Sequence, residues 1–416
     1  MRRGRAWVGV VLVGGLLLRV WLAWRQAPTG DLASFLTAVQ GLQRWGFRFY
    51  GHVNAFDPAA PFGYRDYSYP PGYLPWLWFS SRAAAGGVRF WHLARIPPVA
   101  ADLALAWLVA RELGRRGART GMQVAGAAAI ALGPSFVVSS AIEGQIDAVA
   151  ILPAFVAVLV WERGDPDRRA TVAGLLIGLG AAIKTAPLLV LLALLPTALS
   201  RREMVRVAAW TAAVPVALLL PFLAADPSGT VSSMSYGGFP GAGGLSLVLQ
   251  PGLARHYLGD YDLTSANAAL QSFGWLLTAA GVAAAAVIAF RNRLLATDAA
   301  ALLWLAVYAT GVNWYPQYLA WGVPFLLIAG FTLPVVVAEL ALLPTLLIAY
   351  RDRVASLALP GADASAQFYV AVMDALWLAA VVGFVATIRN LRSPTPRDDR
   401  SARATGADAG RMLGPT

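Results

Sequence analysis

Cysteine is absent from this 416-residue sequence, histidine occurs only three times, and lysine occurs once. Without cysteine the chain forms no disulfide and no thiolate metal site. His52, His92 and His256 are spread along the chain, so a histidine-rich metal site is not expected either. Charged residues make up only 13% of the chain. The cysteine and histidine content therefore indicates no metal site, and no other cofactor is expected.

Apolar residues dominate the composition instead. Hydrophobic residues make up 58% of the chain, and the mean hydropathy is +0.59. A soluble core of this length does not need so much apolar surface, so the sequence predicts an all-α polytopic membrane protein. The net charge of +11 would suggest nucleic acid in a soluble protein. Because the arginines lie mainly in short loops and in the C-terminal tail, the charge indicates membrane topology, and no nucleic acid partner is expected.

The apolar windows predict about twelve membrane spans, within a range of about 10 to 13. They cover residues 6–25, 91–110, 121–141, 146–161, 170–183, 186–199, 204–223, 271–290, 297–312, 317–331, 333–350 and 367–388. Two of them, 170–183 and 186–199, are short, because about 14 residues reach only about 21 Å of a bilayer core of about 30 Å. This pair is expected to form a re-entrant hairpin or to tilt. Residues 1–392 are expected to form one membrane domain, and 393–416 a disordered cytoplasmic tail.

Arginines predict the orientation of these spans. The N-terminal arginines and those at 111–119, 163–169, 201–206, 291–293 and beyond 389 fall on one side, which is cytoplasmic by the positive-inside rule. Both termini are then cytoplasmic, and the first span is expected to be an uncleaved signal anchor. The long loops 26–90, 224–270 and 351–366 fall on the extracytoplasmic side.

Asp31 lies in the first of these long loops. Apolar residues follow it at positions 32, 35, 36, 39 and 42, which predicts an amphipathic helix along the outer membrane surface. Aspartate is a good N-cap, so helix capping is one interpretation of Asp31. The other is a general base, because removing the proton of a sugar hydroxyl lowers the barrier to its attack.

Other polar segments are predicted at the same outer boundary. Candidate substrate-binding residues in them are Tyr69, Glu143, Gln145, Asp147, Lys184, Gln317 and Tyr318. Each has a structural alternative: an interfacial aromatic belt for the tyrosine segments, a capping turn for the acidic segment, and a snorkelling side chain for Lys184. The functional interpretation is that Glu143 and Asp147 hold an acceptor sugar or a divalent cation, while the amides and tyrosines bind a sugar.

Basic residues on the outer side are candidates for binding a lipid phosphate. They are Lys184, Arg255, His256 and Arg351. A departing phosphate gains negative charge, so a cation already held in place stabilises it. The glycine-rich segment 237–244 lacks the lysine and the strand-to-helix setting of a nucleotide-binding loop. A lipid-linked sugar donor is therefore more natural than a nucleotide sugar.

Five short motifs, in their order along the chain, resemble the GT-C membrane glycosyltransferases that use polyprenyl-phosphate sugars. They are Asp31, Tyr69-Pro70-Pro71, Gly144–Asp147, the segment from Gly178 through Lys184 to Pro187, and Pro316–Trp321. The likeness extends over residues 10–330 and is closest to the mannosyltransferase-like group called glycosyltransferase family 87. It implies that Asp31 is the first-loop acid acting as base, and that the anomeric carbon inverts without a covalent intermediate. Many relatives carry paired acids in this loop, whereas here Asp57 and Asp66 lie well after Asp31.

The expected activity is transfer of a hexose, with mannose the commonest in the family, from polyprenyl phosphate to an acceptor hydroxyl outside the cytoplasm. The expected partners are that donor, a glycan or glycolipid acceptor and membrane lipids. A lipid-linked sugar flippase or another transporter is the alternative, and it would need charged residues through the bilayer midplane. A non-catalytic scaffold is a further alternative. The acids and amides gather at the outer edge of the predicted spans, which favours the enzyme.

Overall fold

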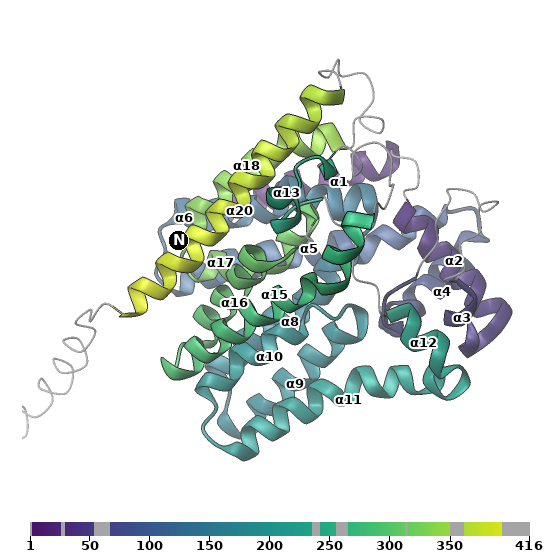
Figure 1. Cartoon of the computed structure of the whole chain (residues 1–416), viewed down its shortest axis with the longest axis horizontal. Coiled ribbons are helices and arrows are strands. Elements are labelled where there is room, and N and C mark those ends of the chain that lie inside the picture. Colours follow the sequence, from purple (N-terminus) through teal and green to yellow (C-terminus); the bar gives the residue numbers. More distant parts are fainter. Residues whose placement is uncertain are drawn as a thin grey trace, which may run out of the picture.

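The computed structural model describes residues 2–25, 30–53, 67–234, 242–254, 265–312, 315–349 and 362–392. Every regular element within these ranges is helical, as Figure 1 shows. Long helices lie side by side as a bundle, and a smaller group of helices covers one end of it. The predicted all-α architecture is confirmed.

The bundle consists of long apolar helices with a few short segments at their ends. Its elements are α1 (Arg2–Arg25), α5 (Phe90–Arg115), α6 (Thr120–Ala131), α7 (Pro134–Val137), η3 (Val138–Glu143), α8 (Asp147–Arg163), α9 (Pro166–Ile183), α10 (Leu188–Leu194), η4 (Leu195–Thr197), α11 (Arg201–Ala225), α15 (Ser265–Arg291), α16 (Ala296–Thr310), η5 (Pro316–Tyr318), α17 (Leu319–Ile328), α18 (Thr332–Ala349) and α20 (Ala362–Arg392). Each predicted apolar window falls on one of these helices or on two or three consecutive ones.

Six stretches of the described chain are long and apolar enough to cross a membrane. They are Gly4–Arg25, Phe90–Arg115, Thr120–Glu143, Arg201–Ala225, Ser272–Arg291 and Ala364–Leu391. Shorter apolar helices at Leu188–Thr197, Ala296–Thr310 and Thr332–Ile348 lie among them. The chain is therefore a multi-pass membrane protein, and about twelve crossings fit this arrangement.

The predicted short pair differs in its first member. Helix α9 begins at Pro166 and has 18 residues. At 1.5 Å per residue it reaches about 27 Å, close to the thickness of a bilayer core. The added residues include Arg168 and Arg169, which precede the predicted window 170–183. The second member remains short, because α10 and η4 together end at Thr197.

Helix α9 packs closely on α11 through two glycines one turn apart. A Cβ at Gly174 would lie 2.6 Å from the carbonyl oxygen of Val207, and one at Gly178 would lie 2.9 Å from that of Thr211. Small residues spaced in this way let membrane helices approach each other, since lipid supplies no hydrophobic force between them. This packing holds the end of α9, where Lys184 follows.

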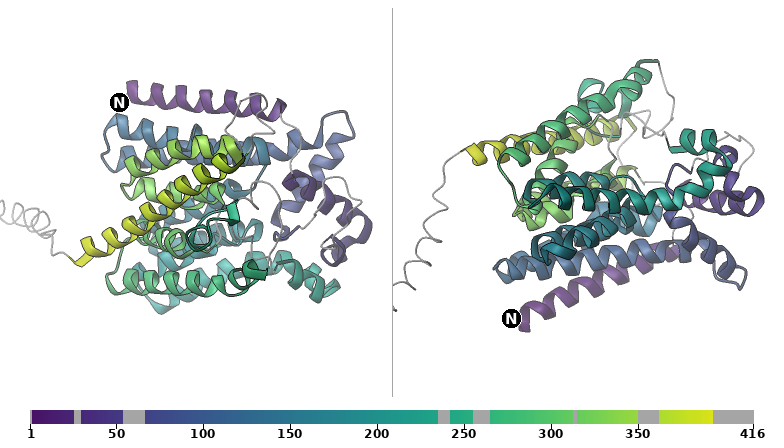
Figure 2. Two further views of the ribbon diagram at one scale, coloured as in Figure 1. Left: turned by 45° about the horizontal axis from the view of Figure 1, so that its top comes forward. Right: turned by 90° about the horizontal axis from the view of Figure 1, so that it is seen from below.

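Ion pairs gather at one end of the bundle. Glu112 pairs with Arg116 at 2.7 Å and also with Arg163, while Arg169 pairs with Glu203 at 2.6 Å. The arginine-rich turns between α5 and α6, α8 and α9, and α10 and α11 therefore share this end. The N-terminal end of α1 lies far from helices α2 (Gly30–Trp45), α3 (Tyr50–Val53) and α4 (Leu74–Ala84) in Figure 2.

The helices of the smaller group pack around aromatic side chains at the opposite end. They are α2 (Gly30–Trp45), η1 (Gly46–Arg48), α3 (Tyr50–Val53), η2 (Pro71–Tyr73), α4 (Leu74–Ala84), α12 (Pro227–Met234) and, nearer the bundle, α13 (Leu245–Leu249). The predicted amphipathic helix is α2, and its apolar face is buried. Phe35 lies 6.2 Å from the ring of Tyr67 and 5.9 Å from that of Tyr69. The apolar face of α2 therefore packs on protein, where the tyrosine-rich loop, which carries Tyr67 and Tyr69, covers it.

Candidate active site

Asp31 lies in the first turn of α2 and is half-buried. Helix α2 already includes Gly30, so Asp31 follows the cap position. Its carboxylate accepts a hydrogen bond from the side chain of Gln145. The Oε1 atom of Gln145 accepts a second hydrogen bond, 3.2 Å long, from the hydroxyl of Tyr69. The amide of Gln145 therefore links Asp31 to the tyrosine-rich loop.

The pKa of Asp31 is raised from 3.8 to about 6, chiefly because burial disfavours the charged carboxylate. Lys184 lowers this pKa, Asp147 raises it, and the hydrogen bond from Gln145 lowers it. Proton transfer is most effective when the pKa of the base is close to the working pH. A carboxylate with this pKa is ionised at pH 7 and accepts a proton more readily than an ordinary aspartate.

Lys184 lies inside the protein rather than at its surface. Only 9% of the residue is exposed, and its Nζ atom lies 2.6 Å from Oδ1 of Asp147. Three aromatic rings surround the ammonium group: the ring centroids of Tyr69, Tyr318 and Trp321 lie 5.4, 5.1 and 5.1 Å from Nζ. Such rings attract a cation through their π faces. Snorkelling, the structural alternative for Lys184, is therefore excluded.

Asp147 is fully buried at the start of α8. Besides Lys184, the indole N–H of Trp321 donates to its Oδ1 atom. The ring of Trp321 stacks on that of Tyr318 with centroids 4.0 Å apart. Segments from α2, the tyrosine-rich loop, the start of α8, the end of α9 and η5–α17 thus meet here. The seven side chains Asp31, Tyr69, Gln145, Asp147, Lys184, Tyr318 and Trp321 are called the Asp31–Lys184 group.

A left-handed turn aims the start of α8 into this group. Gly144 has φ +71°, which glycine adopts without strain. A Cβ there would also lie 2.6 Å from Cδ2 of Leu32, the residue after Asp31. The backbone N–H of Gln145 donates to the carbonyl of Ser139 at 2.8 Å and fixes the exit from η3. Gly144 therefore lets α2 and the η3–α8 turn approach each other closely.

Two buried acceptors at the site have no hydrogen-bond partner among the described residues. They are Oδ2 of Asp147 and Oε1 of Gln317, which lies four residues before Trp321. Buried acceptors of this kind are uncommon, and each needs an explanation. Ligand hydroxyl groups would satisfy both. The described residues contain no group of three or more acidic or histidine side chains that could hold a metal ion.

A family model described as Glycosyltransferase family 87 matches residues 67–312, which is more than half of the chain. The chain belongs to glycosyltransferase family 87. The predicted GT-C family resemblance is confirmed, and the chain is a membrane glycosyltransferase.

The chain is similar to the crystal structure of ArnT from Cupriavidus metallidurans in the apo state. The two share 15% identity with a TM-score of 0.46, and the similarity covers 92% of this chain and 78% of that chain. No curated protein sequence matches the chain.

The family 87 match contains only part of the Asp31–Lys184 group. Tyr69, Gln145, Asp147 and Lys184 lie within residues 67–312. Asp31 precedes the matched region, and η5–α17 with Tyr318 and Trp321 follows it. The structure brings both outlying segments onto the matched core.

Two other predicted site residues are buried close in sequence to the Asp31–Lys184 group, and three lie outside the described residues. Glu143 is buried at the end of η3, two residues before Gln145, and Gln317 is buried beside Tyr318 in η5. The predicted basic residues Arg255, His256 and Arg351 lie outside the described residues, as do the acids Asp57 and Asp66 of the first loop.

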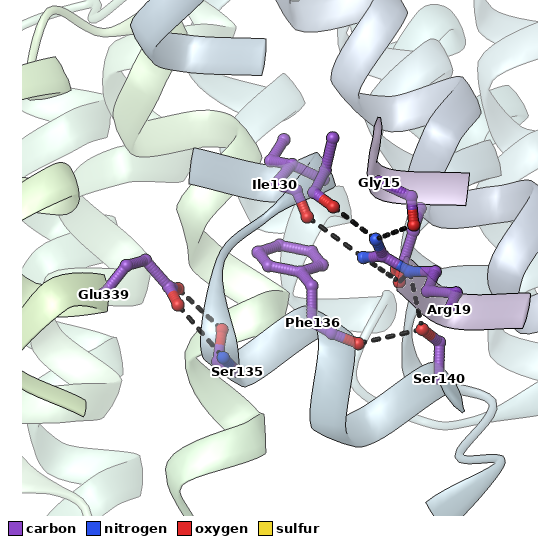
Figure 3. A network of polar contacts seen from close by, with 9 residues as sticks. Gly15, Arg19, Ile130, Ser135, Phe136, Ser140 and Glu339 are labelled. Carbon is purple, nitrogen blue, oxygen red and sulfur yellow. Dashed lines mark hydrogen bonds and ion pairs between the residues drawn. The ribbon is translucent and has the colours of Figure 1, made fainter. Parts of the chain in front are cut away.

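A second polar network in the structure was not predicted from the sequence. Arg19, Asp102 and Glu339 are buried within the bundle, on α1, α5 and α18. Arg19 pairs with Asp102 at 2.8 Å, and Glu339 accepts two hydrogen bonds from Ser135 (Figure 3). All three lie in predicted apolar windows, where ionisable residues are rare and usually functional. That rarity is the signal that would have found them.

Proposed function

We propose that this enzyme moves a hexose, most commonly mannose in its family, from a polyprenyl-phosphate donor to an acceptor hydroxyl outside the cytoplasm. The observation that carries this proposal is the Asp31–Lys184 group, which combines a base of pKa about 6 with a buried cation. The base can activate an alcohol, and the cation can stabilise a departing phosphate. Family membership supplies the reaction class, and the geometry supports the roles of these two residues.

Asp31 acts as the general base in this proposal. Its carboxylate takes the proton of the acceptor hydroxyl as the hydroxyl oxygen bonds to the anomeric carbon. The bond between that carbon and the phosphate oxygen breaks, and polyprenyl phosphate leaves with the electron pair. A single displacement of this kind inverts the anomeric carbon. Gln145 supports Asp31, because its hydrogen bond favours the ionised carboxylate.

Lys184 binds the donor phosphate in this proposal. An ammonium group has three N–H donors, and Asp147 accepts from only one of them. The remaining donors can bind phosphate oxygens, where the negative charge increases as the bond to the sugar breaks. Arg255, His256 and Arg351 are proposed as further phosphate-binding residues.

The hexose is proposed to lie beside the aromatic rings that surround Lys184. Tyr69 and the stacked pair of Tyr318 and Trp321 offer flat faces to a sugar. The unsatisfied acceptors Oδ2 of Asp147 and Oε1 of Gln317 can accept hydrogen bonds from its hydroxyl groups. Glu143 is proposed to contribute on the acceptor side, next to Gln145.

The charge distribution supports an extracytoplasmic site. The arginine-rich turns share one end of the bundle, and the positive-inside rule assigns that end to the cytoplasm. The helices α2, α3 and α4 lie at the other end (Figure 2). Both termini are then cytoplasmic, and residues 393–416 are proposed to be a cytoplasmic tail.

Reconstitution tests the proposal. The purified enzyme in proteoliposomes receives a panel of radiolabelled polyprenyl-phosphate hexoses and a lipid extract as acceptor, and products are identified by mass spectrometry. We expect hexose transfer with an inverted anomeric configuration, and loss of transfer in Asp31→Asn. Wild-type transfer by Asp31→Asn, together with its loss in Asp57→Asn or Asp66→Asn, would assign the base to another acid.

One observation favours the transporter alternative. Arg19, Asp102 and Glu339 are charged residues buried within the bundle, as a transporter would need. Each of them, however, has structural partners: Arg19 pairs with Asp102, and Glu339 binds the start of α7. Movement of a lipid-linked sugar across proteoliposomes without new glycosidic bonds would support transport over transfer.

A further inference from the structure

The apolar stretch Thr120–Glu143 is not one continuous helix. Helix α6 ends at Ala131, and α7 begins at Pro134. Proline has no N–H and clashes with the preceding turn, so Pro134 disfavours continuation of α6. A break inside a bundle leaves carbonyl groups at one helix end and N–H groups at the next without partners. In lipid these groups must be satisfied by other parts of the protein.

Arg19 binds the carbonyl end of this break. Its Nη2 atom donates to the carbonyl of Ile130 at 3.1 Å, and its Nη1 atom donates to that of Ala131. These are the last two residues of α6, and Figure 3 shows the contact with Ile130. Asp102 balances the charge of the guanidinium at 2.8 Å. Arg19 of α1, paired with Asp102 of α5, therefore satisfies the carbonyl groups at this end of the break.

Glu339 binds the other end of the break. Its Oε2 atom accepts from the backbone N–H of Ser135 at 3.0 Å, and its Oε1 atom lies 2.6 Å from the Ser135 hydroxyl. A Cβ on Gly133 would lie 3.0 Å from the same carboxyl group, so glycine leaves room for it. Helix α18 thus fixes the start of α7, opposite Arg19 (Figure 3).

Arg19 also reaches beyond the break. Its Nε atom donates to the hydroxyl of Ser140 in η3 at 3.0 Å, and that hydroxyl donates to the carbonyl of Phe136 at 2.9 Å. One guanidinium therefore holds the end of α6 and the middle of η3 at the same time. The orientation of η3 relative to α6 depends on this bridge.

The segment η3 leads directly into the Asp31–Lys184 group. The backbone N–H of Gln145 donates to the carbonyl of Ser139, next to Ser140. The side chain of Gln145 then binds Asp31. We propose that Arg19 is a positioning residue that sets the place of Gln145 against Asp31 by bridging the break in this span. This inference rests on the proposed function, because it assigns Arg19 a role in that reaction.

Substitution of Arg19 by lysine tests the bridge while keeping the positive charge beside Asp102. Lysine has a compact ammonium group and lacks the planar fork that reaches both sides of the break. In Arg19→Lys we expect kcat to fall about 10- to 100-fold with little change in the KM for the donor, the size of effect that a small misplacement of catalytic groups produces. The exposed Arg119→Lys, at the N-cap of α6, is the matched control.

The pH profile separates positioning from a general loss of stability. The hydrogen bond from Gln145 lowers the pKa of Asp31. If Arg19→Lys weakens that bond, the acid limb of kcat/KM moves to higher pH. An unchanged acid limb in a less active Arg19→Lys enzyme would show a merely structural role and overturn the inference.

A double-mutant cycle with Gln145→Ala gives the second readout. If Arg19 acts through Gln145, Arg19→Lys has little further effect in the Gln145→Ala background. Additive losses would overturn the inference. If Arg19→Lys does not fold, Ser140→Ala is tested in its place. This variant removes only the contact between Arg19 and η3. We expect it to move the acid limb of kcat/KM to higher pH by a smaller amount. A Ser140→Ala enzyme with a wild-type profile would then overturn the inference.

Failure of this inference is distinct from failure of the proposed function. A wild-type enzyme without glycosyl transfer would refute the function. An active wild type, an inactive Asp31→Asn and a fully active Arg19→Lys would refute only the role of Arg19.

Discussion

Lys184 and Asp147 form an ion pair in which Nζ lies 2.6 Å from Oδ1 and both residues are buried. Removing one partner of a buried pair leaves an uncompensated charge, which costs about 3–5 kcal/mol. We therefore expect Asp147→Asn to lower the thermal unfolding temperature strongly and to abolish transfer. Thermal unfolding in detergent measures the first effect. The exposed Arg168→Gln serves as the control for loss of an unburied charge and is expected to unfold like the wild type.

Asp31→Asn is expected to affect activity and stability in opposite directions. A general base contributes about 100- to 10,000-fold to rate, so transfer falls by that order. The folded pKa of about 6 exceeds the ordinary 3.8, so the folded state binds the proton more tightly than the unfolded state. The favourable contribution of the neutral carboxyl is therefore present below pH 3.8 and is lost as the pH rises to about 6. Asparagine does not ionise, so the Asp31→Asn variant does not lose this stability as the pH rises. It should be at least as stable as the wild type at pH 8.

The wild-type rate should follow the same titration. We expect kcat/KM to fall as the pH drops below about 6, because a protonated Asp31 cannot accept the acceptor proton. A comparison is Asp226→Asn, since Asp226 accepts from the N–H of Gly229 at 2.9 Å at the start of α12. The substitution keeps this helix cap, because the side-chain oxygen of asparagine accepts such a hydrogen bond about as well as that of aspartate. It should leave the acid limb unchanged, and a rate independent of pH between 5 and 8 in the wild type would contradict a titrating Asp31.

Trp321→Phe tests the hydrogen bond from the indole to Asp147. The substitution keeps an aromatic ring near Lys184 but removes the Nε1 donor. Hydrogen bonds to charged groups contribute about 1.5–3 kcal/mol, so we expect kcat/KM to fall at least tenfold. Trp304→Phe is the matched control, because the Nε1 atom of Trp304 is buried without a hydrogen-bond partner among the described residues. Equal losses in the two variants would point to ring size instead.

Gly144→Ala tests the close approach of α2 to the turn before α8. Gly144 and Gly117 both have positive φ, +71° and +82°, so alanine costs about 1 kcal/mol of backbone strain at either position. A Cβ at Gly144 would also press on Leu32, whereas one at Gly117 meets nothing within 4 Å. We expect both variants to lose some stability and only Gly144→Ala to lose transfer. Similar activities in the two variants would show that Leu32 moves aside without disturbing Asp31.

The apolar windows predicted the helices well, because a membrane span needs a long apolar run that few other elements share. The main error was α9, where the arginines at its start were assigned to the loop. The break at Leu132–Pro134 was not predicted, because a proline alone does not mark one: α8 contains Pro153 and α11 contains Pro215 without ending. The stability of the break depends on Arg19 and Glu339, which lie more than 100 residues away on either side along the chain.

The site residues were predicted as separate motifs, and their contacts were not. Lys184 illustrates the reason. A lysine at the end of an apolar helix has the same local sequence whether it snorkels outward or points inward. The choice depends on Asp147 and Trp321, which are 37 and 137 positions away in the chain. Only the packing of α9 against its neighbours decides it.

Lys184 is the one lysine of the sequence, and three aromatic rings surround its ammonium group. Apart from the chain's α-amino group, an acylating reagent therefore has a single amine to modify, and that amine lies in the site. The rate at which this amine is acylated would report how often the rings around it open to solvent. Protection from the reagent by an added lipid phosphate would give an occupancy measurement that needs no turnover.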